Sequence, residues 1–376
     1  MVGIDVARGL AVLGMFTAHV GSAAQDVWSP TGWLRVADGR PAAGFALLAG
    51  VSAALLSGGP HVLSGADLRR ARVRILVRAA LLLPLGYLLI ALGTPVAVIL
   101  PGYALMFALV PVALSWSPRA LLLVAGVVAL VGPVAVASVD RETLPLAVVS
   151  ELLVGRYYPA AVWMSYLLVG LAVGRMDLRA PESPRRLATW GVVAAVVGYG
   201  TSAALLPTVG PTHTLRRALL TAEPHANTTP EVVGNIGVVL CVLALSLIGA
   251  RRLIGARRLT GARRLTGDRR LVAARRLPSP LTPLASTGAL ALTAYCGHLV
   301  AIALLGDQVV WSPSNARLMA FVVVTLAATT TWQVAIGRGP LEQVLHRLST
   351  AAALAVVPRA DPVPVVPSAA EADADR

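Results

Sequence analysis

The stretch GIDVARGLAVLGMFTAHV, residues 3–20, is apolar enough to cross a bilayer although it carries Asp5, Arg8 and His19. An α-helix needs about 20 apolar residues to cross roughly 30 Å of hydrocarbon. Comparable runs recur along a chain that is 56% hydrophobic and only 13% charged, and they are too uniformly apolar for the alternating strands of a β-barrel. The sequence predicts an all-α integral membrane protein, a polytopic bundle of about ten transmembrane helices. The predicted helices are 4–23, 42–57, 75–93, 95–114, 119–138, 160–176, 189–206, 231–249, 284–305 and 317–336.

The arginines indicate the orientation of this bundle, because cytoplasmic loops of membrane proteins carry an excess of positive charge. All 32 basic residues are arginines. A cytoplasmic N-terminus places most of them in cytoplasmic segments, whereas the reverse orientation would place most of them outside. Both termini are therefore predicted to be cytoplasmic. The arginines that this orientation places outside are Arg35, Arg40, Arg141, Arg156, Arg216, Arg217 and Arg317.

The first helix could instead be a cleaved signal peptide, because the small residues GSAA follow it at 21–24. Such a peptide begins with a positively charged region, and Asp5 with a lone Arg8 makes a poor one. The orientation also requires this helix to remain in the chain. We therefore interpret it as a transmembrane helix.

Composition also disfavours several classes of function. The net charge of +14 is explained by membrane orientation and contact with anionic lipids, so nucleic-acid binding is not predicted. Cys241 and Cys296 lie in different predicted helices, and no disulfide framework is indicated. The chain has no HExxH or CxxC spacing and no lysine for a phosphate-binding loop, so metal-dependent proteolysis and ATP hydrolysis are poor candidates and no metal is expected.

One membrane domain, residues 1–350, is predicted, since the loops are too short for a soluble domain. Paired arginines repeat every six residues within 250–280, as RRLIGA, RRLTGA, RRLTGD, RRLVAA and RR. A period of six gathers neither arginines nor leucines on one helical face. The pattern favours a low-complexity cytoplasmic loop, either simply solvated or lying against acidic headgroups. Prolines and late acidic residues predict a disordered cytoplasmic tail over 351–376.

Arg8 and His19 lie on one stripe of the first helix. Eleven positions at about 100° each bring them within about 20° of one another, and a rise of about 1.5 Å per residue separates them by roughly 16 Å along the axis. Ionisable groups in a membrane commonly face a cavity and are candidates for function. Guanidinium groups bind phosphate, and imidazole is the usual general base. The alternative is structural: Asp5 and Arg8 form an interfacial ion pair, and His19 makes a structural hydrogen bond.

Further polar residues are predicted near the outer face. His298 and Tyr295 share the ninth predicted helix, and either line the same cavity as His19 or form interhelical hydrogen bonds. His225 lies in the outer loop before the eighth predicted helix, where it either contacts an acceptor or belongs to a helix start. Asp38 and Arg40 flank Gly39, and either hold one another or orient an acceptor.

At the inner face, two groups of basic residues could add phosphate contacts. Arg175 and Asp177 end the sixth predicted helix, and the arginines from Arg69 to Arg78 approach the third. The orientation of the bundle alone would also place them there.

Arg8, a gap of ten residues and His19 in a first transmembrane helix resemble the pattern of acyltransferase-3 membrane enzymes. The wider stretch is still more similar to bacterial proteins with a heparan-α-glucosaminide N-acetyltransferase-like or DUF418 membrane domain. The similarity runs along most of the chain. Besides residues 3–20, it includes DGRPAAGFALLAGVS at 38–52, GRYYPAAVWMSYLLVGLAVGRMDL at 155–178, PHANTTPEVVGNIG at 224–237, LALTAYCGHLV at 290–300 and GRGPLEQVLHR at 337–347.

This resemblance implies an acyl-CoA donor, such as acetyl-CoA, in the cytoplasm and an acceptor on the other side. It implies that Arg8 holds donor phosphate and that His19 is the group nearest the transfer step. Two features depart from the family pattern. Ala289 stands where relatives commonly have an arginine, and the arginine repeat resembles a private insertion.

We therefore expect an O- or N-acyltransferase of a bacterial plasma membrane. Its expected reaction moves an acyl group, in particular acetyl, to a hydroxyl or amine of a sugar or cell-envelope component. Its expected partners are the lipid bilayer, the acyl-CoA donor and an acceptor that includes glycans, and a homodimer remains open. The main alternative is a transporter, because a polar-lined helix bundle also describes a permeation path. A structural membrane subunit without chemistry is a third reading.

Overall fold

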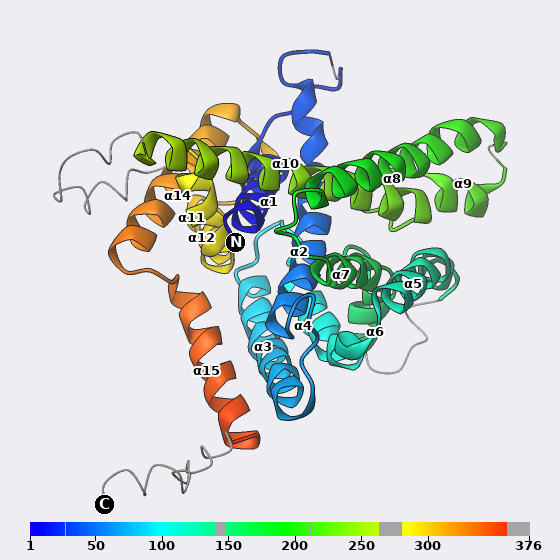
Figure 1. Cartoon of the computed structure of the whole chain (residues 1–376). Coiled ribbons are helices and arrows are strands. Elements are labelled where there is room, and N and C mark those ends of the chain that lie inside the picture. Colours follow the sequence, from blue (N-terminus) through cyan, green and yellow to red (C-terminus); the bar gives the residue numbers. More distant parts are fainter. Residues whose placement is uncertain (27, 140–146, 211, 263–279, 359–376) are drawn as a thin grey trace, which may run out of the picture.

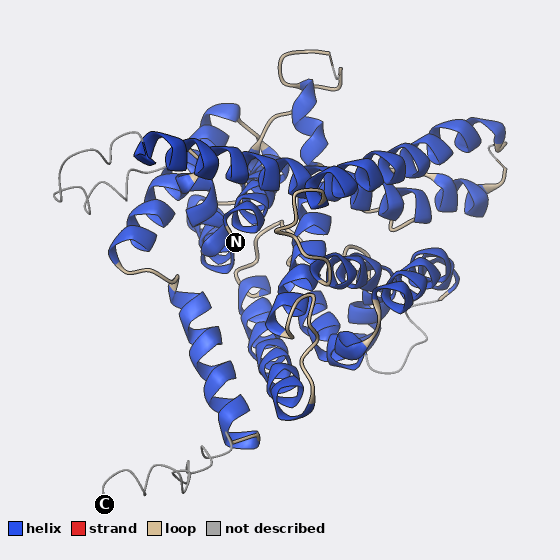
Figure 2. Cartoon of the chain, in the orientation of Figure 1, coloured by secondary structure: helices blue, strands red, loops and turns tan. Residues whose placement is uncertain are grey.

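The computed structural model describes residues 1–26, 28–139, 147–210, 212–262 and 280–358. Within these ranges the regular structure is helical, joined by loops and without strands (Figure 2). The elements are α1 Val2–Val20, η1 Gly32–Ala37, α2 Arg40–Leu56, α3 Gly65–Ile90, α4 Leu100–Leu109, η2 Val110–Ser115, α5 Pro118–Ser138, α6 Ala147–Val154, α7 Ala160–Gly174, α8 Ser183–Leu205, η4 Leu206–Thr208, α9 Thr214–Leu220, α10 Thr229–Ala262, α11 Thr282–Ala289, α12 Ala291–Leu305, α13 Gln308–Trp311, α14 Asn315–Ala335 and α15 Pro340–Val356.

The helices are those of a multi-pass membrane protein, which confirms the predicted class. Six are long and apolar enough to cross a bilayer, and the bent pair α11 and α12 makes up to seven by length and composition. Three further apolar helices are shorter, Arg40–Leu56, Leu100–Ser115 and Ala160–Gly174. Each predicted run coincides with one of these elements. A 17-residue helix such as α2 is only about 26 Å long, so ten complete crossings and the cytoplasmic placement of both termini stay predictions.

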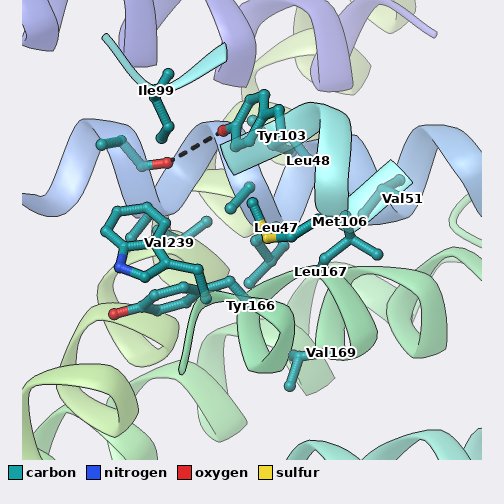
Figure 3. Packing of buried hydrophobic residues seen from close by; sticks show 14 of the residues in the cluster. Leu47, Leu48, Val51, Ile99, Tyr103, Met106, Tyr166, Leu167, Val169 and Val239 are labelled. Carbon is teal, nitrogen blue, oxygen red and sulfur yellow. Dashed lines mark hydrogen bonds between the residues drawn. The ribbon is translucent and has the colours of Figure 1, made fainter. Parts of the chain in front are cut away.

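The core lies where α2, α4 and α7 meet. Leu47, Met106 and Leu167 come from these three helices and are fully buried together (Figure 3). Gly50 and Gly170 bring the backbones of α2 and α7 into contact, because a Cβ at either position would overlap a carbonyl of the other helix. Small residues allow such close approach of helices in membranes. Because lipid tails are as apolar as the helix surfaces, helix association there depends on close packing.

Helix α1 lies among α2, α10, α11 and α14 near the middle of the fold (Figure 1). Gly9 of α1 and Gly288 of α11 sit backbone against backbone, so that a Cβ on Gly288 would overlap the Asp5 carbonyl. This contact sets the turn of α1 that carries Arg8 directly against the end of α11.

Helices α11 and α12 form one bent element with an angle of 84°. The break exposes the first amide groups of α12, and Glu342 of α15 satisfies them. Its carboxylate accepts hydrogen bonds from the amides of Leu292 and Thr293 at 2.8 and 3.0 Å, and from the Thr293 hydroxyl at 2.6 Å. A carboxylate at a helix N-terminus also complements the helix dipole. Helix α15, which runs beside α3 in Figure 1, therefore holds the start of α12 in place.

Two boundaries differ from the sequence prediction. Helix α15 continues to Val356, so residues 351–356 are helical and do not belong to a disordered tail; alanines there favour helix. Helix α10 continues to Ala262, so the first part of the predicted arginine-rich loop is a helical extension. The rest of that loop, from 263 to 279, and the tail from 359 lie outside the described residues.

Candidate functional site

A cavity of about 250 Å³ opens between α1, α2, α3, α4, α11, α12 and α15. Its walls are mostly apolar, with polar groups at the end nearest Arg8. Two turns further along α1, Met15 lines the same cavity, about 10 Å from Arg8 along the axis. The residues that line it are Arg8, Met15, Phe45, Leu48, Ala49, Ser52, Arg78, Leu82, Ile99, Leu100, Tyr103, Phe107, Gly288, Ala289, Ala291, Leu292, Tyr295, Glu342 and Leu345.

Arg8 is held in place by two hydrogen bonds. It donates to the Asp5 carboxylate at 2.8 Å and to the hydroxyl of Ser52 on α2 at 2.8 Å. The ion pair with Asp5, which the structural reading of this helix requires, is therefore present. A guanidinium has five N–H donors, so Arg8 retains donors that can face a ligand in the cavity.

Further arginines surround this end of the cavity. Arg78 of α3 lies in the wall and interacts electrostatically with Arg8, Arg74 and Arg338. The Nε atoms of Arg74 and Arg78 are buried and have no hydrogen-bond partner among the described residues. Among the described residues, ion pairs to acidic groups involve Met1, Arg8 and Arg70. Arg74, Arg78 and Arg338 form none of these ion pairs.

The imidazole of His346 on α15 faces the same group of charges. Burial lowers its pKa, and the positive charges of Arg338, Arg74 and Arg78 lower it further. Arg8 has one acidic partner, Asp5, whereas Arg74, Arg78 and Arg338 have none among the described ion pairs. Such an excess of clustered cations favours a multivalent anion such as a phosphate. We call Arg8, Arg74, Arg78 and Arg338 the arginine cluster.

His19 meets His298 toward the opposite end of α1. His19 Nδ1 and His298 Nε2 are 3.1 Å apart, and the two rings are within 14° of parallel. Their ring centroids are 5.3 Å apart. This distance exceeds the separation of the two nitrogens by about twice the distance from the centre of an imidazole ring to one of its nitrogens. Both nitrogens therefore lie nearly on the line between the centroids, as in a linear hydrogen bond.

Aromatic rings fix the position of His298, which is itself buried. Its centroid lies 4.9 Å from that of Phe16 and 5.3 Å from that of Tyr295. Tyr295 also lines the cavity, and its hydroxyl accepts a hydrogen bond from the amide of Ile99. The cavity thus ends at Met15 and Tyr295, and neither histidine forms part of its wall.

His225 approaches His19 from the loop before α10, close enough for the two to interact electrostatically. The loop is tightly built: His225 and Asn227 have φ of 61° and 55°, unusual for residues with a side chain. Glu231 holds it, accepting the amide hydrogens of both residues at 2.8 and 2.7 Å. The Nδ1 atom of His225 is buried without a hydrogen-bond partner among the described residues.

Asp38 and Arg40 do not form an ion pair with each other among the described contacts. Arg40 instead donates to the Tyr199 hydroxyl at 2.9 Å and to the Arg35 carbonyl at 3.1 Å. Asp38 is half-buried, and burial raises the pKa of its carboxyl against the opposing influence of Arg35, Arg40 and His225. Burial lowers the pKa of His225, opposed by the Tyr157 carbonyl and by Asp38.

Arg175 has a structural role that leaves it unsuited to a ligand. Its guanidinium is buried and donates to the carbonyls of Ala54, Gly59 and Leu114 and to the Ser57 hydroxyl. It therefore ties α7 to the end of α2, away from the cavity.

The structure thus gathers the predicted residues in two places. Arg8 lies at the end of the cavity on the side predicted to be cytoplasmic, which we call the inner end, and Tyr295 lies at its far end. His19 and His298 meet beyond it, and His225 interacts electrostatically with His19. The sequence does not mark Ser52, Arg338, His346 or Glu342 as site residues, because their partners lie far away in the chain. It does predict phosphate contacts for the arginines from Arg69 to Arg78. Within the described residues, no group of three or more His, Cys, Asp or Glu side chains could hold a metal ion.

Comparison with known proteins gives one family. The family described as heparan-alpha-glucosaminide N-acetyltransferase, catalytic, matches residues 1–205. This segment contains Arg8, His19, Asp38, Arg74 and Arg78 but not His225 or His298. The search among curated proteins found no match to the chain.

Proposed function

Because the chain belongs to the heparan-alpha-glucosaminide N-acetyltransferase family, we propose that it transfers an acetyl group from acetyl-CoA to an acceptor across the bilayer. The donor enters from the side predicted to be cytoplasmic, and the acceptor is an amine or hydroxyl on the opposite side. The observation that carries this proposal is that one helix, α1, links a cavity bordered by Arg8 and Arg78 to a histidine pair at its other end.

The arginine cluster would bind the phosphates of the donor. A cavity of about 250 Å³ lies below the usual range of about 300–1,000 Å³ for pockets that enclose a drug-sized ligand. It suits the narrow pantetheine arm, and the nucleotide would stay at the mouth. The apolar walls complement the methylene groups of the arm, while Arg78 and the free donors of Arg8 face its phosphates.

His19 would carry the transfer step. In the direct route its Nε2 takes the proton of the acceptor, the acceptor nitrogen or oxygen bonds to the thioester carbonyl carbon, and the C–S bond breaks. The CoA thiolate leaves with the electron pair and is then protonated. In the two-step route Nε2 first bonds to the carbonyl carbon as the C–S bond breaks and the CoA thiolate leaves with the electron pair; the acceptor then bonds to that carbon, the bond from Nε2 to it breaks, and the acceptor proton passes to the freed imidazole. Either route requires the thioester to pass Met15 and Tyr295, which separate the cavity from His19.

The acceptor would approach from the outer loops. Asp38 and His225 lie on that side and interact electrostatically with one another. A carboxylate beside an imidazole offers hydrogen bonds to an amino sugar, which has ammonium and hydroxyl groups. This placement and the family together favour a glycan or another amine-bearing envelope component.

Purified protein with radiolabelled acetyl-CoA and glucosamine or glucosaminide acceptors tests the function. We expect an acetylated product with the wild type, and an increased KM for acetyl-CoA with Arg8→Ala. A wild type that binds acetyl-CoA but acetylates no amine or hydroxyl acceptor would refute the proposal.

Transport is the second candidate, favoured by the bent pair α11 and α12, because broken helices mark substrate sites in many transporters. Such transporters usually repeat the break in a matching half, and the described residues contain one bent pair. Flux of a labelled solute through proteoliposomes without consumption of acetyl-CoA would support transport over acetylation.

A further inference from the structure

The second histidine of the pair, His298, has no part in the proposed chemistry above. It lies 279 positions from His19 in the chain, on α12, does not line the cavity, and contacts no acidic side chain among the described residues. Its Nε2 nevertheless points straight at Nδ1 of His19. A buried polar ring aimed at another residue in this manner requires an explanation.

Two neutral imidazoles that meet through one nitrogen each must divide their protons unequally. One facing nitrogen donates and the other accepts, and the tautomer of each ring follows from the contact at its other nitrogen. Knowing the surroundings of His298 therefore fixes which nitrogen of His19 carries hydrogen.

The surroundings of His298 consist of acceptors. Besides His19, the polar groups that interact with its ring are the backbone carbonyls of Ala294 and Tyr295, one turn earlier on α12. Carbonyl oxygens accept hydrogen bonds and donate none. These nearby carbonyls favour hydrogen on Nδ1 of His298, a buried atom that has no hydrogen-bond partner among the described residues. The Nε2 atom of His298 then carries a lone pair that faces His19.

We infer that His298 is a positioning residue that holds His19 in its Nδ1–H tautomer, so that the lone pair of His19 Nε2 is free for the transfer step. The effect of His298 on catalysis rests on the proposed function, whereas the tautomer of His19 does not depend on it. The Nε2 atom of His19 has no hydrogen-bond partner among the described residues, and His225 is close enough to interact electrostatically with the ring of His19. Phe16 and Tyr295 keep the ring of His298 in line.

Two amide substitutions of similar polarity distinguish a positioning role from a structural one. In His298→Gln, the side-chain oxygen can reach the place of Nε2 and accept from His19 Nδ1–H. In His298→Asn, the shorter side chain places its amide near Nδ1 and leaves His19 without an acceptor. Leu299→Ala, which removes a fully buried side chain from the neighbouring position of α12, controls for a loosened helix.

Steady-state acetyl transfer provides the first readout. We expect His298→Asn to lower kcat by about 10–100-fold, as loss of a supporting hydrogen bond does elsewhere, with the KM for acetyl-CoA unchanged. His298→Gln should stay within a few-fold of the wild type. Equal losses in the Gln and Asn variants, or wild-type kcat in both, would overturn the inference.

Nitrogen-15 NMR of protein with labelled histidine provides a readout that needs no activity. The chain has six histidines, and the His19 signals are assigned by their loss in His19→Gln. We expect Nδ1 of His19 to be protonated in the wild type and in His298→Gln, and a mixture of tautomers in His298→Asn. An Nε2–H tautomer in the wild type would overturn the inference even if no acetyl transfer is detected, whereas an Nδ1–H tautomer in an inactive protein would leave it standing and refute only the proposed function.

Discussion

The two ends of the site hold their polar groups in different ways. At the inner end, Arg74 and Arg78 have buried Nε atoms without hydrogen-bond partners among the described residues, and the charged groups that act on these two side chains are other arginines. At the outer end, His19 and His298 satisfy each other through one hydrogen bond between neutral rings. A group of positive charges with few acidic partners suits binding of an anion, whereas a neutral histidine pair held in one geometry suits proton transfer. We therefore expect changes at the inner end to alter KM and changes at the outer end to alter kcat.

The largest effect should follow from His19→Ala. Removal of a general base costs about 10²–10⁴ in rate, so kcat for acetyl transfer should fall by that amount while acetyl-CoA still binds. His213→Ala is a matched control, because His213 is an exposed histidine of an outer loop. Turnover that survives His19→Ala unchanged would show that the pair at the outer end takes no part in the chemistry.

Arg78→Ala should weaken the binding of acetyl-CoA and should not slow the transfer step. A hydrogen bond to a charged group contributes about 1.5–3 kcal/mol, which corresponds to a rise of roughly 10–100-fold in the KM for acetyl-CoA. Arg69→Ala removes an exposed arginine from the same helix outside the cavity and should leave KM unchanged. If both variants behave alike, the cluster acts only through its general charge, and the contrast between the two ends fails.

Glu342→Gln should weaken both ends together, because Glu342 joins α15 to the start of α12, the helix that carries His298. The neutral amide keeps one acceptor for the amides of α12 but loses charge assistance and the second acceptor for Thr293. We expect about 1 kcal/mol of lost stability, measured by thermal unfolding in detergent, with modest changes in both kcat and KM. Glu182→Gln, at an exposed helix start, serves as the comparison and should unfold as the wild type does.

The smallest effect concerns pH and the outer loop. Burial lowers the pKa of His225 in the folded state, so the unfolded chain binds its proton more readily. Stability from this residue is therefore present above the ordinary histidine pKa of about 6.5 and is lost as pH falls below it. The melting temperature should fall less between pH 7.5 and 5.5 in His225→Gln than in the wild type. Asp38 has the opposite sign, because its raised pKa favours the folded state at lower pH, in the acid range.

Sequence alone could predict what depends on local period and composition. The helical phase of α1 predicts Arg8 and His19 on one stripe, and the structure places Arg8 in the cavity wall and His19 against His298. The apolar runs likewise predicted the six helices that are long and apolar enough to cross a bilayer. The short lengths of α2 and α7, however, leave the number of crossings a prediction.

Contacts between distant segments could not be predicted in this way. Ser52 holds Arg8, and Glu342 caps α12, across 44 and at least 49 positions. No periodicity encodes such pairs, which arise from the packing of glycine-lined helices. Arg175 shows the converse: a position at the inner face suggested a phosphate contact, but its guanidinium is used by backbone carbonyls. Residues 351–356 differ for a local reason: the prolines after them predict a tail, whereas the alanines of this segment extend α15 to Val356.

Sidedness of the reaction tests the central claim most directly. Protein is reconstituted in proteoliposomes of known orientation, with radiolabelled acetyl-CoA on the side of the arginine cluster and a membrane-impermeant glucosaminide on the other side. We predict that the acetylated product forms only in this arrangement and disappears with His19→Ala. Product that forms only when donor and acceptor share one compartment would contradict an acetyl transfer along α1 from the arginine cluster to His19.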